Sequence, residues 1–227
     1  MMRIARVVPM VFGTCLLCAA SVSAQPPASP AAADSRAYAE VNVGPTFGHK
    51  SDVSVGGEGG YQIRRDLFVS AEVGHIGNAA SSDLDSRATD IANNAGAAAN
   101  VIAKVTYFDA GVRYQFVTNS PKIHPYVVGG FGAARVTTDT TFSVNGSIVP
   151  PDALGIILGN DLAGSQTAPF LMFGGGAYID IASRYFADVS YRYGRVFSKT
   201  EQSGSETVIT LAAFNTSRLQ VGLGIKF

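Results

Sequence analysis

One short cluster has the residue types of a hydrolytic site, namely His49-Lys50-Ser51. In an extended chain His49 and Ser51 point to the same side, as a general base and a hydroxyl nucleophile must. Such a pair also needs a third group that orients the histidine, and Asp52 is too close in the sequence to serve convincingly. We therefore interpret the cluster as polar turn residues and predict no catalytic residue.

The sequence does not support a metal-binding site either. His49, His75 and His124 fall in different segments and lack the paired spacing of metal ligands. Asp83 and Asp85 lie in a stretch without the further oxygen ligands and the glycine of a calcium loop. We predict neither a metal site nor a cofactor site.

Charged residues that alternate with apolar ones form the strongest chemical pattern. Asp109 and Arg113 alternate with Phe108 and Val112, and the segment around Arg192 repeats this pattern. Such alternation places one face of a strand in an apolar medium and the other in a polar medium. The opposite phase would put each arginine into lipid at about 2–4 kcal/mol near the middle of a membrane. The sequence thus predicts charges inside and apolar side chains outside.

These inward charges are predicted to form a network in the lumen of a barrel. An eight-stranded barrel is just wide enough for side chains to fill it, and charges enclosed there must pair. A packed polar plug and a gated ion path are both consistent with the pattern, and the narrow barrel favours the plug. The predicted members are Glu40, Glu58, Glu72, Asp109, Arg113, Asp188, Arg192 and Lys226, with Arg184 near the rim.

Eight alternating segments must position these side chains, and each is long enough for a tilted strand to cross a bilayer. The segments are 37–48, 52–63, 66–77, 101–117, 123–136, 168–181, 184–197 and 216–227. The facing of 123–136 stays unassigned, because apolar residues and glycines occupy both phases.

Apart from the short link near His49, the connections alternate between short turns and the long loops 78–100, 137–167 and 198–215, as in outer-membrane proteins with periplasmic turns. A soluble barrel of the lipocalin type would have the opposite polarity. We predict an all-β fold, an eight-stranded antiparallel closed transmembrane β-barrel.

The N-terminal region predicts export. A basic start, an apolar run and Val22-Ser23-Ala24 fit a signal peptide over 1–24, followed by a flexible leader over 25–36 and the barrel over 37–227. Both cysteines, Cys15 and Cys18, fall within this peptide. Without it, 15 basic residues face 17 acidic ones, which argues against a nucleic-acid partner. The expected location is the outer membrane, in contact with its lipid.

Several motifs resemble the small outer-membrane β-barrel family of OmpA and OmpX type. They are the final GLGIKF, the strand starting at His124-Pro125-Tyr126, and Tyr191-Arg192-Tyr193. The resemblance implies a monomer whose last strand, through Leu223, Ile225 and Phe227, is the signal read by the barrel-assembly machinery. Because the sequence ends at Phe227, we expect no peptidoglycan-binding domain.

The expected function is non-enzymatic: a structural, surface-interaction or envelope-integrity role carried by long extracellular loops, with an extracellular or host-surface partner. A narrow, porin-like pore for small solutes is the main alternative. A lipid-modifying enzyme is a distant third, because His49-Lys50-Ser51 is similar to the His-x-Ser arrangement of an outer-membrane lipid A deacylase. Within the longest loop, the apolar segment 150–159 predicts one short helix from Pro151 to Gly159.

Overall fold

The computed structural model describes residues 36–203 and 206–227. The predicted signal peptide, and the leader up to residue 35, lie outside the described residues. The elements in chain order are β1 (Ala37–Phe47), β2 (Val53–Arg64), β3 (Leu67–Ile76), α1 (Ser82–Asn94), β4 (Ala98–Gln115), β5 (Ile123–Val144), β6 (Ser147–Val149), the 3-10 helix η1 (Pro151–Leu154), β7 (Gly164–Asp180), β8 (Tyr185–Val196), β9 (Lys199–Ser203), β10 (Glu206–Leu211) and β11 (Phe214–Lys226).

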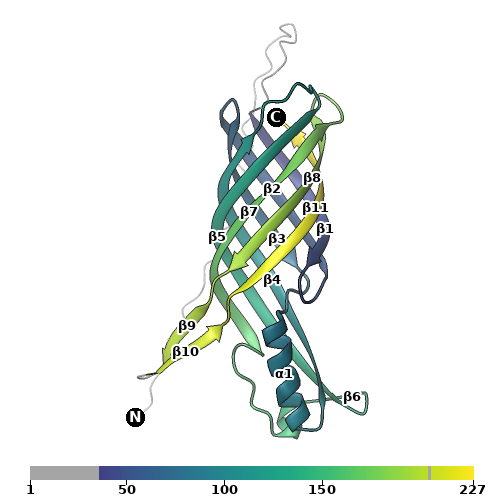
Figure 1. Cartoon of the computed structure of the whole chain (residues 1–227), viewed down its shortest axis with the longest axis vertical. Coiled ribbons are helices and arrows are strands. Elements are labelled where there is room, and N and C mark those ends of the chain that lie inside the picture. The colour runs from purple at the N-terminus through teal and green to yellow at the C-terminus, as the bar shows by residue number, and fades with distance from the viewer. Residues whose placement is uncertain (1–35, 204–205) are drawn as a thin grey trace, which may run out of the picture. The chain divides into compact units, whose positions relative to one another are not determined.

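Eight of these strands close into a barrel (Figure 1). Their order is β4-β3-β2-β1-β11-β8-β7-β5, and β5 returns to pair with β4, with every pairing antiparallel. The first and last strands meet in register, with Tyr38 opposite Lys226 and Val43 opposite Val221. The predicted eight-stranded antiparallel closed barrel is confirmed.

The barrel has a turn end and a loop end. Short turns join β2 to β3, β4 to β5 and β7 to β8 at the turn end, and β1 begins and β11 ends there. At the loop end β4, β5 and β7 run further than predicted, and they carry α1, β6 and η1 (Figure 1). A separate hairpin of β9 and β10 replaces part of the predicted loop 198–215.

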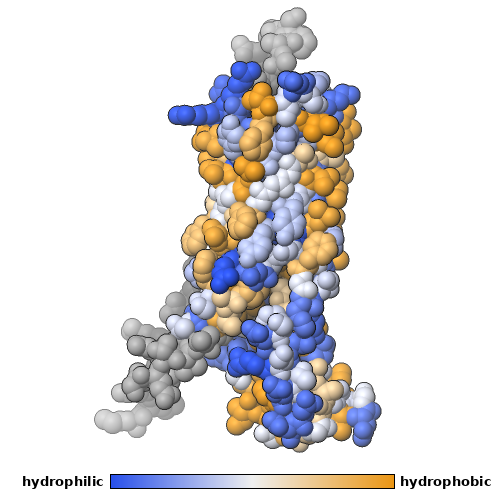
Figure 2. Space-filling view, in the orientation of Figure 1, coloured by the Kyte–Doolittle hydropathy of each residue, from blue (hydrophilic) through white to orange (hydrophobic). Residues whose placement is uncertain are grey.

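The barrel wall has the predicted polarity. Large apolar side chains face outward around the barrel, among them Phe108 at 54% and Phe131 at 59% exposed (Figure 2). The strand whose facing was unassigned, β5, turns Tyr126 and Val128 inward and Val127 outward. Among the described residues, no helix has the length and apolar character to cross a membrane.

The long loops hold ordered structure that the periodicity did not reveal. Helix α1 covers a stretch interpreted as a solvated loop, and Ser81 caps it by accepting a hydrogen bond from the Leu84 amide. The predicted helix over 150–159 is wrong in extent. It is a single 3-10 turn that ends at Leu154, because Gly155 adopts a left-handed conformation with φ 67°.

A small apolar core lies at the loop end. Ala88 of α1 packs with the inward side chains Val101 and Ala103 of β4, and Leu162 joins the same cluster. The helix is tied down at its surface, because Arg87 pairs with Asp161 at 2.6 Å. The core therefore makes an ordered assembly of the extended strands and the helix.

Candidate functional site

Four acidic side chains cross one wall of the barrel in a continuous row. The register pairs Glu40 with Glu58, Glu58 with Glu72, and Glu72 with Asp109, so the row runs over β1, β2, β3 and β4. Each side chain points into the lumen and is at most 5% exposed. Like charges directly opposite on neighbouring strands are destabilising. The row therefore requires cations from elsewhere in the barrel.

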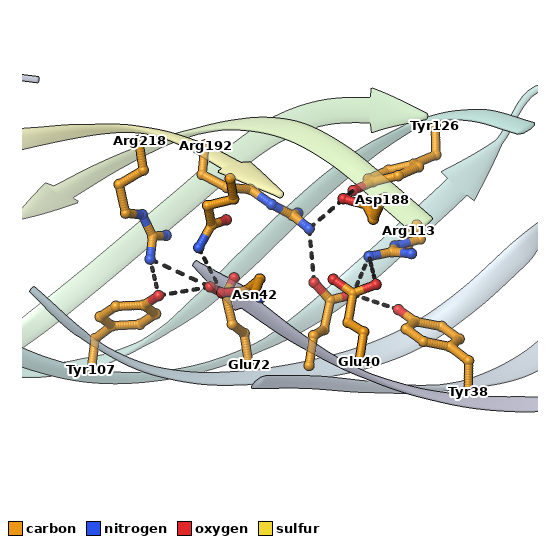
Figure 3. A network of polar contacts seen from close by, with 12 residues as sticks. Tyr38, Glu40, Asn42, Glu72, Tyr107, Arg113, Tyr126, Asp188, Arg192 and Arg218 are labelled. Atoms are coloured by element: carbon orange, nitrogen blue, oxygen red, sulfur yellow. Dashed lines mark hydrogen bonds and ion pairs between the residues drawn. The ribbon is translucent and has the colours of Figure 1, made fainter. Parts of the chain in front are cut away.

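The opposite wall supplies two of those cations. Arg192 of β8 and Arg218 of β11 are register partners on neighbouring strands. Figure 3 shows both side chains reaching over the lumen toward the acidic row. Both guanidinium groups are completely buried. Arg113 of β4 adds a third buried cation, so the lumen holds charges of both signs on facing walls.

Glu58 is the centre of the larger of two charge clusters. Its Oε1 forms an ion pair with Nη2 of Arg113 at 2.7 Å, and its Oε2 accepts a hydrogen bond from Nη2 of Arg192 at 2.8 Å. The Tyr38 hydroxyl donates to the same carboxylate. Arg113 also lies 3.7 Å from Glu40, so one arginine serves two neighbouring acids.

Aromatic rings complete this first cluster. The guanidinium of Arg113 stacks over the rings of Tyr38 and Tyr126, at 4.6 and 4.0 Å from their centroids. The Tyr126 hydroxyl donates to Asp188 at 3.0 Å and accepts from Arg192 at 3.3 Å. Cation–π contacts strengthen on desolvation, so the rings stabilise cations that have left water.

The second cluster contains a residue that our sequence reasoning missed. Arg218 donates to Glu72 at 3.3 Å and to the Tyr107 hydroxyl, and Tyr107 donates to Glu72 at 2.7 Å (Figure 3). The signal was present, because Arg218 shares its phase with Gln220, an inward residue of the same strand. Gln220 donates to Asn42 at 2.9 Å between the two clusters.

Glycines make room for the inward aromatic rings. Tyr38 lies against Gly60 and Tyr107 against Gly74, each directly across on the neighbouring strand. A Cβ added to Gly74 would lie 2.2 Å from the Tyr107 hydroxyl oxygen. The absence of a side chain at these positions lets the rings lie flat on the wall and meet the guanidinium groups.

Lys226 lies apart from the other predicted members. It contacts Asp180 near the turn end, where His124 also reaches Asp180 at 3.2 Å and stacks on Tyr178. Asp109, by contrast, lies in the acidic row as predicted. Its side chain receives no hydrogen bond or ion pair from the residues that the structure describes.

The cations at the centre of the lumen are shielded from water. Arg192 and Arg218 have 0% of their surface accessible, and Arg113 has 1%. The arrangement suits a packed, paired plug, as expected for a barrel of eight strands.

In the structure the cluster His49-Lys50-Ser51 has a neighbouring carboxylate, but its serine is not paired with its histidine. His49 lies 3.1 Å from Asp85 of α1, and Lys50 binds the same carboxylate at 2.8 Å. In the described part of the chain no hydrogen bond reaches the Ser51 side chain, so serine and histidine do not form a pair. His49 and Lys50 attach the β1–β2 loop to α1 through Asp85. No group of three or more potential metal ligands occurs among the described residues.

This attachment should depend on pH. Hydrogen bonds from Lys50 and His49 lower the pKa of Asp85 below its usual range. An aspartate whose pKa is lower in the folded than in the unfolded protein stabilises the fold at every pH above the ordinary aspartate pKa. This stability is lost as the pH falls through the lowered pKa of the folded protein. Because Lys50 and Asp85 are partly exposed, we expect their ion pair to contribute only about 0.2–1 kcal/mol to the free energy of unfolding.

Nuclear magnetic resonance of the α1 amides checks this expectation. Amides near Asp85 should shift as the pH falls below about 4, and Asp85→Asn should produce the shifted state at neutral pH. The matched variant Asp83→Asn, on the same helix, should behave like the wild type. Loss of the pH response in Asp83→Asn but not in Asp85→Asn would contradict the assignment.

A closed barrel with an apolar outer face and a paired polar interior is a transmembrane β-barrel of the outer-membrane class. The family model for the outer membrane protein beta-barrel domain matches residues 14–227, and the chain belongs to this family. The protein is therefore an outer-membrane protein, and its predicted resemblance to small outer-membrane barrels is confirmed.

Several solved structures are similar to this chain. Neisserial surface protein A is 17% identical with a TM-score of 0.50, covering 84% of this chain and 96% of that chain. The N-terminal β-barrel domain of Pseudomonas aeruginosa OprF is 16% identical, with a TM-score of 0.43 and coverage of 84% and 97%. A major outer membrane protein of Thermus thermophilus is 9% identical, with a TM-score of 0.49 and coverage of 84% and 99%. At these identities the likeness concerns the fold alone. No curated protein matches the sequence.

Proposed function

We propose that this protein is a non-enzymatic, non-conducting outer-membrane barrel. Its role is structural, in surface interaction or in envelope integrity, and the assembly at its loop end carries that role. The burial of the central charge cluster is the observation that supports this proposal most directly. Glu58 joins Arg113 and Arg192 across the barrel, and all three side chains are at most 3% exposed.

The loop end supports the same proposal. There the apolar core fixes α1 to the extended strands, so the loops present a defined surface. At its outer edge Ile157 is 95% and Ile148 77% exposed, and a shallow hollow runs between Ile91 of α1 and the turn after Leu154. Exposed apolar groups on a rigid scaffold are typical of a contact surface. An extracellular or host-surface partner would bind here.

The last strand has a proposed partner of its own. Leu223 points outward from β11 and is 62% exposed, Phe227 directly after the strand is 63% exposed, and Ile225 of β11 is half-buried. We propose that this apolar face is what the barrel-assembly machinery recognises.

Conductance in planar bilayers tests the closed lumen. Wild-type protein should give no stable single-channel steps. The triple variant Glu58→Ser/Arg113→Ser/Arg192→Ser shortens the side chains that fill the centre, and should conduct if it folds. A barrel that migrates differently before and after boiling in denaturing gels confirms folding. Large, stable wild-type conductance would instead make this protein a small porin.

Loop replacement tests the site of activity. A variant with short turns in place of residues 79–97 and 145–159 should insert normally but fail to restore a deletion strain in envelope-permeability and surface-attachment assays. As a matched control, Arg64→Gln/Lys122→Gln changes the turn end only and should restore the strain. Full restoration by the loop-replaced barrel would contradict the proposal.

A further inference from the structure

A polar, cationic patch interrupts the outward face of the barrel near its loop end. The register places its side chains in two adjacent rows across β3, β4, β5 and β7, and all of them are exposed or half-buried. We call this surface the boundary patch. The first row is His75, Thr106, Arg135 and Thr167, and the second is Lys104, Thr137 and Ser165.

The boundary patch lies where the hydrocarbon layer ends. A tilted strand needs about 9–11 residues to cross that layer, and the chain from Phe116 back to Thr106 has this length. Val73 and Phe108 lie in the next row on the membrane side and Phe131 in the row after it, and each of these apolar side chains is more than half exposed. Thr106 and Arg135 therefore sit at the edge of the layer, and Lys104 sits at headgroup level.

The two cations of the patch have no anionic partner among the residues that the structure describes. Within the described ranges, no ion pair or hydrogen bond reaches the side chain of Lys104 or Arg135. Asp139 lies on the same outward face, one row further from the membrane, and is not within ion-pair distance of either cation. By contrast Arg195, an outward arginine on β8, donates to Asn215 at 3.0 Å.

Hydroxyl groups surround these cations. Thr106 lies directly between His75 and Arg135 in the register, and its Oγ1 is 3.0 Å from Nδ1 of His75. Thr137 and Ser165 are joined by a hydrogen bond of 2.7 Å beside Lys104. Cations with adjacent hydroxyls form a donor set suited to a phosphate, and the planar arginine can bind it through two parallel bonds.

We propose that the boundary patch binds the phosphate groups of a phosphorylated glycolipid in the outer leaflet. The turn end is taken as periplasmic, as in other outer-membrane barrels, so the patch faces that leaflet. An amphiphile places its phosphates at the patch and its acyl chains on Phe108 and Phe131. A free phosphate would reach the cations but not the apolar surface. The binding site is independent of the loop-end surface proposed above.

Binding of lipid A to the folded barrel in phosphatidylcholine nanodiscs tests the proposal, with chemically dephosphorylated lipid A as the reference ligand. The variant Lys104→Gln/Arg135→Gln should bind lipid A about 25-fold more weakly, taking about fivefold for each basic residue near a charged lipid surface. The control Arg64→Gln/Lys122→Gln removes the same charge at the turn end and should bind as the wild type does. Asp139→Asn should tighten binding by a few fold, and added salt should weaken wild-type binding.

Each outcome decides the proposal. Equal weakening by the two double variants would mean that only net charge matters, and would overturn it. Equal affinity of the wild type for phosphorylated and dephosphorylated lipid A would overturn it as well. If Lys104→Gln/Arg135→Gln failed to show heat-modifiable mobility in gels, Asp139→Asn would remain as a test, and unchanged binding in that variant would count against the patch.

Discussion

Arg113→Met should strongly lower the free energy of unfolding of the barrel. The variant retains an unbranched apolar stem but removes the guanidinium that binds Glu58 at 2.7 Å and contacts the rings of Tyr38 and Tyr126. Glu58 would still hold Arg192, but Glu40 would lose its only ion-pair partner among the described residues. Breaking a buried pair costs about 3–5 kcal/mol, because the remaining charge is uncompensated.

Equilibrium unfolding by denaturant in detergent micelles measures this effect as a shift of the midpoint. Arg64→Met, which removes an exposed arginine at the turn end, should change the free energy of unfolding by less than about 0.5 kcal/mol. Adding Glu40→Gln to Arg113→Met should recover part of the loss, since it removes the uncompensated carboxylate. Small and equal effects of Arg113→Met and Arg64→Met would indicate a water-filled lumen, and would favour the pore.

Gly74→Val should also destabilise the barrel strongly, through lost space rather than lost charge. The new Cβ would lie 2.2 Å from the hydroxyl oxygen of Tyr107, so the ring must move away from the wall. Overpacking of this kind costs about 1–3 kcal/mol. Loss of the 2.7 Å hydrogen bond from Tyr107 to the carboxylate of Glu72 adds about 1.5–3 kcal/mol.

A glycine on the other face of the barrel provides the matched control. Gly129 of β5 faces lipid, and a Cβ added there would approach only the carbonyl oxygen of Met172, at 3.8 Å. Valine also favours extended backbone, so Gly129→Val should leave the unfolding midpoint unchanged or raise it. If both valine variants lowered the midpoint equally, glycine would matter here for backbone conformation rather than for the space it leaves to Tyr107.

The sequence by itself determined the barrel and the direction of its side chains. A period of two residues is a local property, so Phe108 could be placed in lipid and Asp109 in the lumen without knowledge of any partner strand. The number of such alternating segments then set the strand number. Facing was ambiguous only in β5, because glycines and apolar residues there fit both phases.

Only the tertiary structure decided which charges meet. Periodicity gives the face of a residue but neither its register nor its position around the barrel, which depend on strand tilt and on the stagger at closure. Closure placed Arg192 and Arg218 opposite the row of Glu40, Glu58 and Glu72, and placed Lys226 with Asp180 near the turn end. Helix α1 could likewise not be predicted from periodicity. Its two buried alanines need the extension of β4 beyond the membrane to pack against. Such pairings join residues far apart in sequence, and the geometry of the closed barrel is what makes them neighbours.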